Sequence, residues 1–408
     1  MPGPTFMPVL SGGSWAPQPW EAQVTGADSS VVGLENFVPS RYPRTRAARA
    51  AQSVLTGGVS WPVLCVGDST TEGFNGSTAN CVSQSWVRRL ADLLTARGYK
   101  AGWQNVLGDH RADTQGPSNI QTIDTRVTAL PADWSLANGI GIAPGIGGNF
   151  WINQSNVNPF TFSPTVPTDT LDVFYFDFSG YDTITVKSGA AGATAATTGG
   201  TISITASSRI KKATATYTLG TNVWTVQKTT ANAAALILMG VSAYNSTLPE
   251  VSLLNLGCGS QLTAYFADIA NQWSSLSSVS LAGSGLITTT AIIDVGINDW
   301  FVPTSQAVMV ATLTTIVTTL QAAGTEVLFI VPVPSALGSA SAANQAAINN
   351  AIISVAYATG CAFISMAKRW RSQALAQPLG YYGDVTIHPS TIGYSDKAEA
   401  ISQFFFAL

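Results

Sequence analysis

The chain has 408 residues, which is too long for one ordinary domain and predicts two or more units. Hydrophobic residues make up 46% of the sequence and charged residues only 10%, so we expect sizeable cores beneath a surface of Ser, Thr, Asn and Gln. The net charge of −3, without a dense run of Lys and Arg, argues against a nucleic-acid-binding protein.

Membrane spans, secretory leaders and disulfide scaffolds are not expected either. No stretch has the roughly eighteen uninterrupted apolar residues of a membrane span, and the opening Met1-Pro2-Gly3-Pro4 lacks the pattern of a secretory signal. The cysteines lack zinc-finger or thioredoxin spacing, so we expect no metal site and no disulfide framework. They are Cys65, Cys81, Cys258 and Cys361.

Residues 1–60 are rich in Pro, Gly and Ser, and helical periodicity appears only near residues 44–54. We interpret this segment as an arm that lies on the body of the protein or on a partner. Four basic residues in it are read as a solvated helix face, namely Arg41, Arg44, Arg46 and Arg49.

Residues 61–104 form a βα unit. The apolar run Val63–Val66 predicts a buried strand that stops at Gly67-Asp68-Ser69, and a helix with one apolar face follows before Gly98. A serine at the carboxyl end of such a strand lies at the rim of the sheet, where open α/β folds hold their ligands.

Residues 105–250 differ in character, because Gly and Thr increase and apolar residues alternate by twos. Several short strands separated by turns predict a β-sandwich. Its aromatic residues are expected in the core more often than on a sugar-binding surface. They are Trp151, Phe174, Tyr175, Phe176, Tyr181 and Trp224.

From residue 251 onward strands alternate with helices again, which predicts a parallel sheet covered on both faces. The expected helices include Ala342–Thr359 and a last one whose apolar face carries Tyr394 and Phe405. The simplest organisation is one α/β domain, residues 61–104 and 251–408, interrupted by an all-β insertion at 105–250.

Four polar blocks lie at strand ends or before the last helix of the α/β portion. They are Gly67-Asp68-Ser69, Asn255–Ser260, Gly296–Asp299 and Asp384–Pro389. A serine hydroxyl becomes a nucleophile when a histidine takes its proton, and an acid fixes the tautomer of that histidine. An oxyanion needs donors, which the N–H groups of Ser69 and Gly259 and the amide of Asn298 would supply.

Each residue also has a simpler interpretation. A lone Gly-Asp-Ser usually marks a turn, and Asn298 would serve equally as a helix cap. The chain has two histidines, of which His110 is read as a solvated loop residue, so His388 is the candidate base. The order of all four blocks favours a catalytic site over these readings.

These four blocks, in this order, resemble the SGNH (GDSL-type) hydrolases. Members of that family are esterases, lipases, thioesterases and carbohydrate O-deacetylases with a flavodoxin-like three-layer α/β/α fold and no metal or cofactor. The resemblance covers residues 61–104 and 251–408. It implies Ser69 as nucleophile, His388 as base, and Gly259 and Asn298 in the oxyanion hole.

Two features depart from the family pattern. Three residues separate Asp384 from His388 where the family usually has two, so either Asp384 completes a triad or a Ser–His pair works with a backbone carbonyl. The glycine block is also shorter than usual, so Gly257 competes with Gly259 for the oxyanion hole.

The insertion is similar to jelly-roll modules of SGNH proteins that act on polysaccharides, several of them from bacteriophage tails. The expected function is therefore a serine esterase that removes O-acetyl groups from a carbohydrate polymer, outside the cell or on a virion. The arm at 1–60 would mediate virion attachment or homo-oligomer formation. The alternatives are a lipid or aryl esterase, a thioesterase, and a non-catalytic receptor-binding virion protein.

Overall fold

The computed structural model describes residues 33–52, 60–77, 79–107, 120–128, 131, 133–137, 150–154, 157–189, 195–207, 209–267, 288–302, 304–335, 341–384 and 387–408. Everything described below lies in one compact unit, Val31–Leu408. Among the described residues no helix combines the length and the apolar character needed to cross a membrane.

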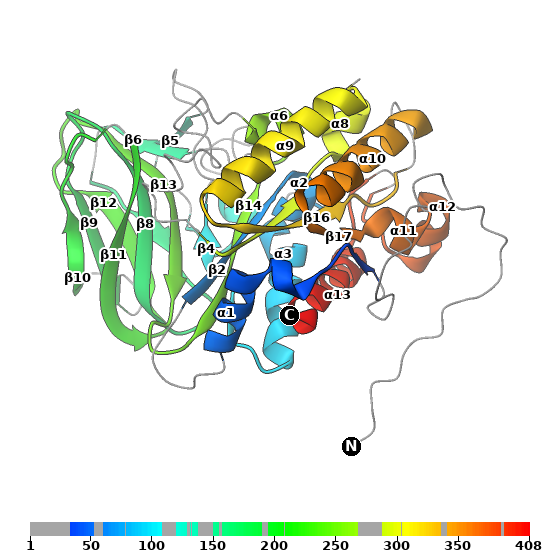
Figure 1. Cartoon of the computed structure of the whole chain (residues 1–408). Helices are drawn as coiled ribbons and strands as arrows, with labels where there is room; N and C mark the ends of the chain where they lie inside the picture. Colours follow the sequence, from blue (N-terminus) through cyan, green and yellow to red (C-terminus); the bar gives the residue numbers. More distant parts are fainter. Residues whose placement is uncertain are drawn as a thin grey trace. The chain divides into compact units, whose positions relative to one another are not determined.

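A mixed seven-stranded sheet forms the α/β body (Figure 1). Across the sheet its strands are β1 (Leu34–Glu35), β17 (Ala362–Ser365), β16 (Glu326–Val331), β15 (Thr290–Asp294), β2 (Ser60–Gly67), β14 (Glu250–Gly257) and β3 (Ala101–Gly102). All neighbours are parallel except β1, which runs antiparallel to β17. The predicted parallel sheet is confirmed, with one antiparallel edge strand added.

The order of the parallel strands decides where a ligand would bind. Leaving out the short β3, the strands β2, β14, β15, β16 and β17 lie in the spatial order 2-1-3-4-5 when numbered along the chain. This is the flavodoxin-like order, in which the direction of winding reverses between the first and third strands. Here that switch point lies between β2 and β15.

Helices cover both faces of this sheet (Figure 1). On one face α9 packs against α10, and on the other α13 packs against α3. The described helices are α1 (Pro43–Ala51), α2 (Ser69–Glu72), α3 (Trp86–Ala96), α5 (Ile120–Ile123), α6 (Thr263–Phe266), α8 (Ile297–Phe301), α9 (Gln306–Ala322), α10 (Ala342–Thr359), α11 (Met366–Trp370), α12 (Gln373–Ala376) and α13 (Thr391–Ala407). Short 3-10 turns are η2 (Pro39–Arg41), η3 (Cys81–Gln84) and η5 (Gln377–Leu379).

Local sequence explains the ends of the long helices. The side chain of Ser341 caps α10 by accepting from Asn344 N–H, and Gly360 ends the helix at φ 72°, a conformation that only glycine adopts without cost. Ser305 caps α9 in the same way. The predicted helix Ala342–Thr359 is confirmed.

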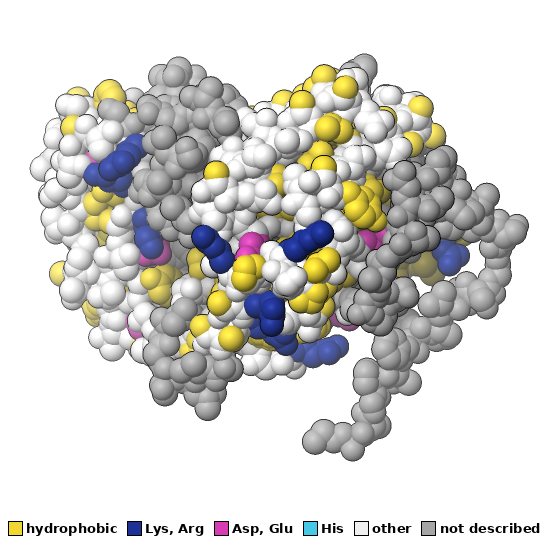
Figure 2. All heavy atoms as spheres, viewed as in Figure 1, with side chains coloured by type: hydrophobic (Ala, Val, Ile, Leu, Met, Phe, Trp, Pro, Cys, Tyr) yellow, Lys and Arg dark blue, Asp and Glu magenta, His cyan; other side chains and the backbone are white. Residues whose placement is uncertain are grey.

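Part of the segment interpreted as an arm packs into this body. β1 extends the sheet, and Tyr42 is buried, with its hydroxyl donating to the carbonyl of Val327 at 3.1 Å. Figure 2 shows Lys and Arg side chains gathered where α1 lies, on a face that otherwise carries few charges. Residues 1–32 lie outside the described residues.

A second, antiparallel sheet lies between β3 and β14 in the sequence. Its ten strands are β5 (Trp134–Ala137), β6 (Phe150–Asn153), β13 (Leu236–Tyr244), β8 (Thr168–Asp177), β11 (Arg209–Gly220), β10 (Ala195–Ile202), β9 (Ile184–Gly189), β12 (Val223–Lys228) and β7 (Phe160–Phe162) in spatial order, with β4 (Asn105–Val106) also paired to β13. β10 meets β11 at the single pair Thr198–Thr216. The sheet therefore curls there, and its two ends face each other.

The curled sheet encloses its own hydrophobic core, which contains Trp151, Tyr175 and Trp224. Phe174 and Phe176 are also buried, whereas Tyr181 is only partly buried. Two layers were expected from the sequence, and the structure builds them from one hydrogen-bonded sheet. Aromatic residues of the segment thus serve mainly as core.

The chain crosses between the two sheets twice, at neighbouring points. It leaves through the two residues between β3 and β4 and returns between β13 and β14. The side chain of Asn105 ties the sheets together: its amide donates to Leu253 O at 2.8 Å, and its oxygen accepts from Asn255 N at 3.0 Å. This connectivity is compatible with an insertion into the α/β body.

Candidate active site

The candidate blocks lie at one edge of the parallel sheet, at the carboxyl ends of its central strands. Gly67, at the end of β2, is paired with Gly257 of β14 on one side and with Asp294 of β15 on the other. Ser69 begins α2 directly after β2, and Asn298 lies in α8 directly after β15. This edge is the switch point of the sheet, where open α/β folds bind their ligands.

Two glycines allow α2 to lie this close to the strand ends. A Cβ on Gly67 would lie 2.2 Å from Thr71 Oγ1, and a Cβ on Gly257 would lie 2.1 Å from the backbone nitrogen of Glu72. Any side chain at either position would push the Ser69 turn off the sheet. Packing alone therefore accounts for Gly257, whether or not it also contributes to an oxyanion hole.

Ser69, His388 and Asp384 form a continuous line of hydrogen bonds. Ser69 Oγ lies 3.0 Å from His388 Nε2, and His388 Nδ1 lies 2.5 Å from Asp384 Oδ2. The serine is 2% exposed, whereas the side chains of His388 and Asp384 are 12% and 23% exposed. The line thus starts in the body of the protein and reaches the surface at its acid end.

The three-residue spacing before His388 is accommodated by a turn of the backbone. Asp384 Oδ1 accepts hydrogen bonds from the backbone N–H groups of Ile387 at 2.9 Å and His388 at 3.1 Å. These bonds fold the loop back, so that the other carboxylate oxygen reaches the imidazole. Asp384 therefore can act as the third member, and no backbone carbonyl is needed for that role.

Phe74 holds the imidazole from the side, which the sequence analysis missed. Its ring meets that of His388 edge to face, with centroids 4.6 Å apart and planes at 86°. The carbonyl of Phe74 accepts from the hydroxyl of Tyr394 in α13 at 2.5 Å. An aromatic residue in a polar turn directly after the serine block was the available signal.

Asn298 is positioned as a donor and not as a helix cap. The residue before α8 is Gly296, at φ 113°, and it takes the cap position that was the alternative for Asn298. One hydrogen of the Asn298 amide bonds Gln261 O at 2.9 Å, and a primary amide carries two. The second hydrogen is therefore available to a substrate.

Gly259 lies in the turn after β14, and this turn is fastened to α8. Asp299 Oδ2 accepts from both the backbone nitrogen and the hydroxyl of Thr263, at 3.0 and 2.7 Å. The Gly259 turn and the Asn298 helix are thereby held together. The structure brings the two candidate donor segments to the same edge as Ser69.

Buried charge lies directly beneath the nucleophile. Asp68 is 1% exposed and caps α2 by accepting from Thr70 N–H at 2.9 Å. Burial, and then the nearby carboxylate of Asp294, raise the pKa of Asp68 to about 7. Among the described residues no group of three or more His, Cys, Asp or Glu is arranged to hold a metal ion.

His110 lies outside the described residues, so its predicted role as a solvated loop residue is not tested. The four cysteines are buried, and none of them is part of a disulfide. Burial raises the pKa of both Cys65 and Cys361 above the ordinary thiol value. None of them is a candidate catalytic or oxyanion-hole residue.

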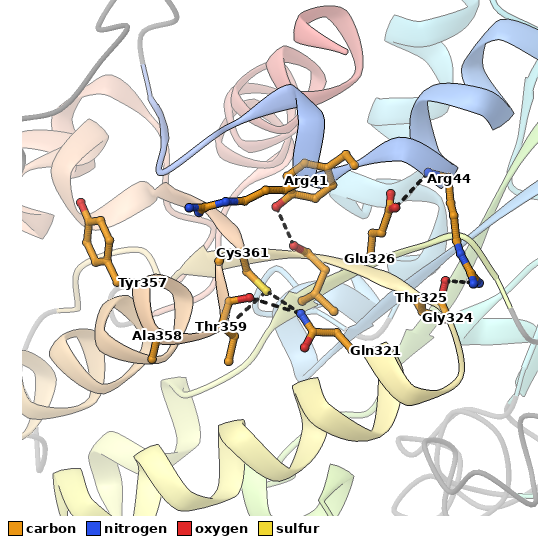
Figure 3. A pocket seen from close by; sticks show the side chains of 13 residues that line it. Arg41, Arg44, Gln321, Gly324, Thr325, Glu326, Tyr357, Ala358, Thr359 and Cys361 are labelled. Atoms are coloured by element: carbon orange, nitrogen blue, oxygen red, sulfur yellow. Dashed lines mark hydrogen bonds between the residues drawn. The ribbon is translucent and has the colours of Figure 1, made fainter.

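A groove of about 590 Å³ lies at the other edge of the sheet, where β16 and β17 begin (Figure 3). Arg41, Arg44 and Glu326 line it, together with residues of α9 and α10. Arg44 donates its backbone N–H to Glu326 and its guanidinium to Gly324 O, both at 2.9 Å. None of the candidate catalytic residues lines this groove.

Residues 240–395 match the model of the GDSL-like Lipase/Acylhydrolase family. The matched segment contains Gly259, Asn298, Asp384 and His388, and it does not include Ser69. The chain thus carries a GDSL-like segment that holds three of the four candidate blocks. No curated protein sequence matches the chain.

Among solved structures, the chain is similar to a peptidoglycan O-acetylesterase, at 12% identity and a TM-score of 0.63. The likeness covers 92% of this chain and 99% of that one, so it includes both sheets. A lipase/acylhydrolase from Enterococcus faecalis is 17% identical, covering 38% of this chain and 75% of that one with a TM-score of 0.32. An acetyl xylan esterase is 15% identical, with coverage of 38% and 81% and a TM-score of 0.30. At these identities the first likeness shows a shared fold.

Proposed function

We propose that this protein is a serine esterase that removes O-acetyl groups from a carbohydrate polymer. The observation that carries the proposal is the hydrogen-bonded line Ser69–His388–Asp384 at the switch point of the parallel sheet. A serine, a histidine and an acid in this order form the constellation that hydrolyses acyl compounds on several unrelated folds. The GDSL-like match of residues 240–395 supports the same reaction class.

In this mechanism His388 Nε2 takes the proton of Ser69 as its oxygen attacks the acyl carbon. Asp384 accepts a hydrogen bond from the Nδ1–H of His388, which fixes the tautomer with a free Nε2 and stabilises the imidazolium once it forms. The oxyanion is stabilised by the N–H of Ser69, the N–H of Gly259 and the amide of Asn298.

The tetrahedral intermediate then collapses. His388 returns its proton to the oxygen of the departing sugar hydroxyl, leaving an acetyl group on Ser69. A water molecule, deprotonated by the same histidine, attacks this ester, and acetate and the free serine result. No metal or cofactor takes part in these steps.

The proposal of a glycan substrate rests on the second sheet. The likeness to a peptidoglycan O-acetylesterase extends over 92% of the chain, and a match to the α/β body alone would not reach that share. We infer that the curled sheet forms one wall of the cleft or grips the glycan. We further propose that the protein acts outside the cell or on a virion, where the arm at 1–60 would attach it or mediate oligomer formation.

Acetate release tests this function. Purified protein is incubated with O-acetylated peptidoglycan and with acetylated xylan, and acetate is measured beside the variants Ser69→Ala and Ser395→Ala. We expect Ser69→Ala to lower the rate on the order of 10⁴-fold or more, as the loss of a nucleophilic serine does elsewhere. Ser395, whose hydroxyl bonds Thr391 O on α13, is the matched control and should leave the rate unchanged.

The outcomes separate the alternatives. An unchanged rate in Ser69→Ala would refute the mechanism. Hydrolysis of aryl or lipid esters without acetate release from any glycan would favour a lipid or aryl esterase. Failure of a fluorophosphonate to label Ser69, together with no hydrolysis, would favour a non-catalytic binding protein.

A further inference from the structure

A buried ion pair lies behind the candidate nucleophile. Lys397 Nζ lies 2.5 Å from Asp294 Oδ2, and the two side chains are 0% and 1% exposed. The same oxygen accepts from Thr71 Oγ1 at 2.8 Å, Trp86 Nε1 at 3.1 Å and Thr70 Oγ1 at 3.3 Å. One carboxylate oxygen is therefore the meeting point of four donors.

The pair and its threonine partners lie close in sequence to three of the candidate blocks. Thr70 and Thr71 directly follow Ser69 in α2. Asp294 is the last residue of β15 and precedes Asn298 by four positions. Lys397 belongs to α13, the helix that begins three residues after His388. The pair thus connects the segments that supply the nucleophile, the base and an oxyanion donor.

Stability alone does not explain such a pair. Removing two charges from water costs several kcal/mol for each ion, and the attraction between them often does no more than offset that loss. Apolar side chains of the same volume commonly pack as well or better. What a buried pair provides is a fixed geometry, because each charge is satisfied in one arrangement only.

We propose that Lys397 and Asp294 are positioning residues that set the distance between Ser69 Oγ and His388 Nε2. The proposal rests on the esterase function proposed above. The pair clamps the start of α2 against the helix that follows His388, and the oxygen–nitrogen distance of 3.0 Å depends on both. A shift of about 1 Å would take it beyond hydrogen-bond range, and misplacement of that size costs about 10²-fold in rate.

The test replaces both charges together, because a single replacement would leave the other charge buried and unpaired. The double variant Asp294→Asn/Lys397→Met keeps side-chain volumes similar. Its matched control is Arg369→Met/Asp396→Asn, which removes an ion pair between α11 and α13, with two contacts of 2.8 Å, that does not reach α2. Wild type and both double variants are compared by steady-state kinetics, by the rate of fluorophosphonate labelling and by crystal structures.

We expect the first double variant to fold, with kcat about 10²-fold lower and KM within about twofold of wild type. Labelling of Ser69 should slow in parallel, and its Oγ should lie more than 3.5 Å from His388 Nε2 in the crystal structure. The control should change none of these. A kcat within about threefold of wild type with the 3.0 Å contact kept would overturn the proposal.

A milder pair of variants covers the case in which the double variant does not fold. Thr71→Val keeps the shape of the side chain and removes its hydrogen bond to Asp294, and Thr71→Ser restores the hydroxyl. We expect kcat about tenfold lower in Thr71→Val and recovered in Thr71→Ser; equal rates in both would count against positioning. If wild type itself neither hydrolyses esters nor reacts at Ser69, the esterase proposal fails, and the crystal structures still decide the positioning role.

Discussion

The two sheets of this protein bury their charges in different ways. In the curled sheet Asp177 accepts from the backbone and hydroxyls of Thr205 and Ser207, and Asp169 accepts from the backbone and hydroxyl of Ser246, so each of them fixes one turn. In the α/β body Asp294 collects donors from α2, α3 and α13 at one point.

The difference shows which part of the molecule needs the relative positions of distant segments to be fixed. A carboxylate that satisfies one turn stabilises that turn and constrains little else. A carboxylate that joins three distant segments fixes their mutual positions, and catalysis needs such positions held to fractions of an ångström. The convergent network lies beside Ser69, whereas Asp177 and Asp169 in the curled sheet each fix one turn.

The largest expected effect is a difference in kcat between variants of the two histidines. His388→Gln should lower kcat on the order of 10⁴-fold or more, because Ser69 loses its base, with little change in KM. His110→Gln, which lies between β4 and α5 in the sequence, should leave kcat unchanged. Acetate release under saturating substrate measures both. Comparable losses in the two variants would mean that His388 has no special role.

A smaller effect is expected for two asparagines, Asn298 at the candidate site and Asn222 in the curled sheet. Asn298→Ala should lower kcat on the order of 10²–10³-fold, because an oxyanion donor is lost. Asn222 in the curled sheet bonds Thr168 O and Thr218 O, at 2.6 and 2.8 Å. Asn222→Ala should instead lower the free energy of unfolding by about 1–3 kcal/mol at unchanged kcat.

Urea unfolding and acetate release on both asparagine variants measure this contrast. The expected pattern is a rate defect without a stability defect of equal size for Asn298, and the reverse for Asn222. If Asn222→Ala lost as much rate per folded molecule as Asn298→Ala, the curled sheet would have to hold part of the catalytic geometry.

The smallest expected effect is on the pH dependence of stability. Buried carboxylates of the α/β body and of the curled sheet shift it in opposite directions. Burial raises the pKa of Asp68 to about 7, and burial likewise raises that of Glu250, the first residue of β14, to about 7. Burial alone would raise the pKa of Asp177 too, but hydrogen bonds from Lys211, Ser207 and Thr205 outweigh it and hold the value below the ordinary range.

The signs follow from linkage. A raised carboxyl pKa stabilises the folded chain below about pH 4 and loses that contribution as pH rises toward 7. The lowered pKa of Asp177 acts in reverse, and its contribution is lost as pH falls below about 4. Asp68→Asn should therefore increase the free energy of unfolding relative to wild type by more at pH 8 than at pH 4, and at about 1.4 kcal/mol per pKa unit the extra increase should not exceed about 4 kcal/mol. Urea unfolding at both pH values measures it, and a difference independent of pH would contradict the buried-acid assignment.

The strands and helices of the α/β body could be predicted from the sequence because their apolar patterns are strong. The run Val63–Val66 lies inside β2. The strand ends at Gly67, two residues before Ser69, as the glycine indicated. The order of polar blocks also indicated which residues would meet. Local patterns and block order therefore sufficed for the positions of Ser69, Asn298 and His388.

The tertiary contacts that hold those residues in place could not be predicted from the sequence. Lys397 is one polar residue in a helix whose apolar face carries Tyr394 and Phe405, and nothing local distinguishes it from a solvated lysine. Its burial depends on Asp294, more than a hundred positions away. The burial of Tyr42 could not be predicted for the same reason, since its hydroxyl bonds the distant carbonyl of Val327. Contacts of this kind are decided by tertiary packing, which periodicity does not encode.

The pairing of β2 with β14 has a consequence for how the protein is made. Residues 68–249 separate these neighbours, and they include the whole curled sheet. Closing so long a loop is slow, and contacts between distant segments form late in folding. During translation both sides of β2, the strand that precedes Ser69, therefore stay unpaired until the ribosome has made β14 and β15. The curled sheet has time to fold on its own first, and the cleft is assembled last.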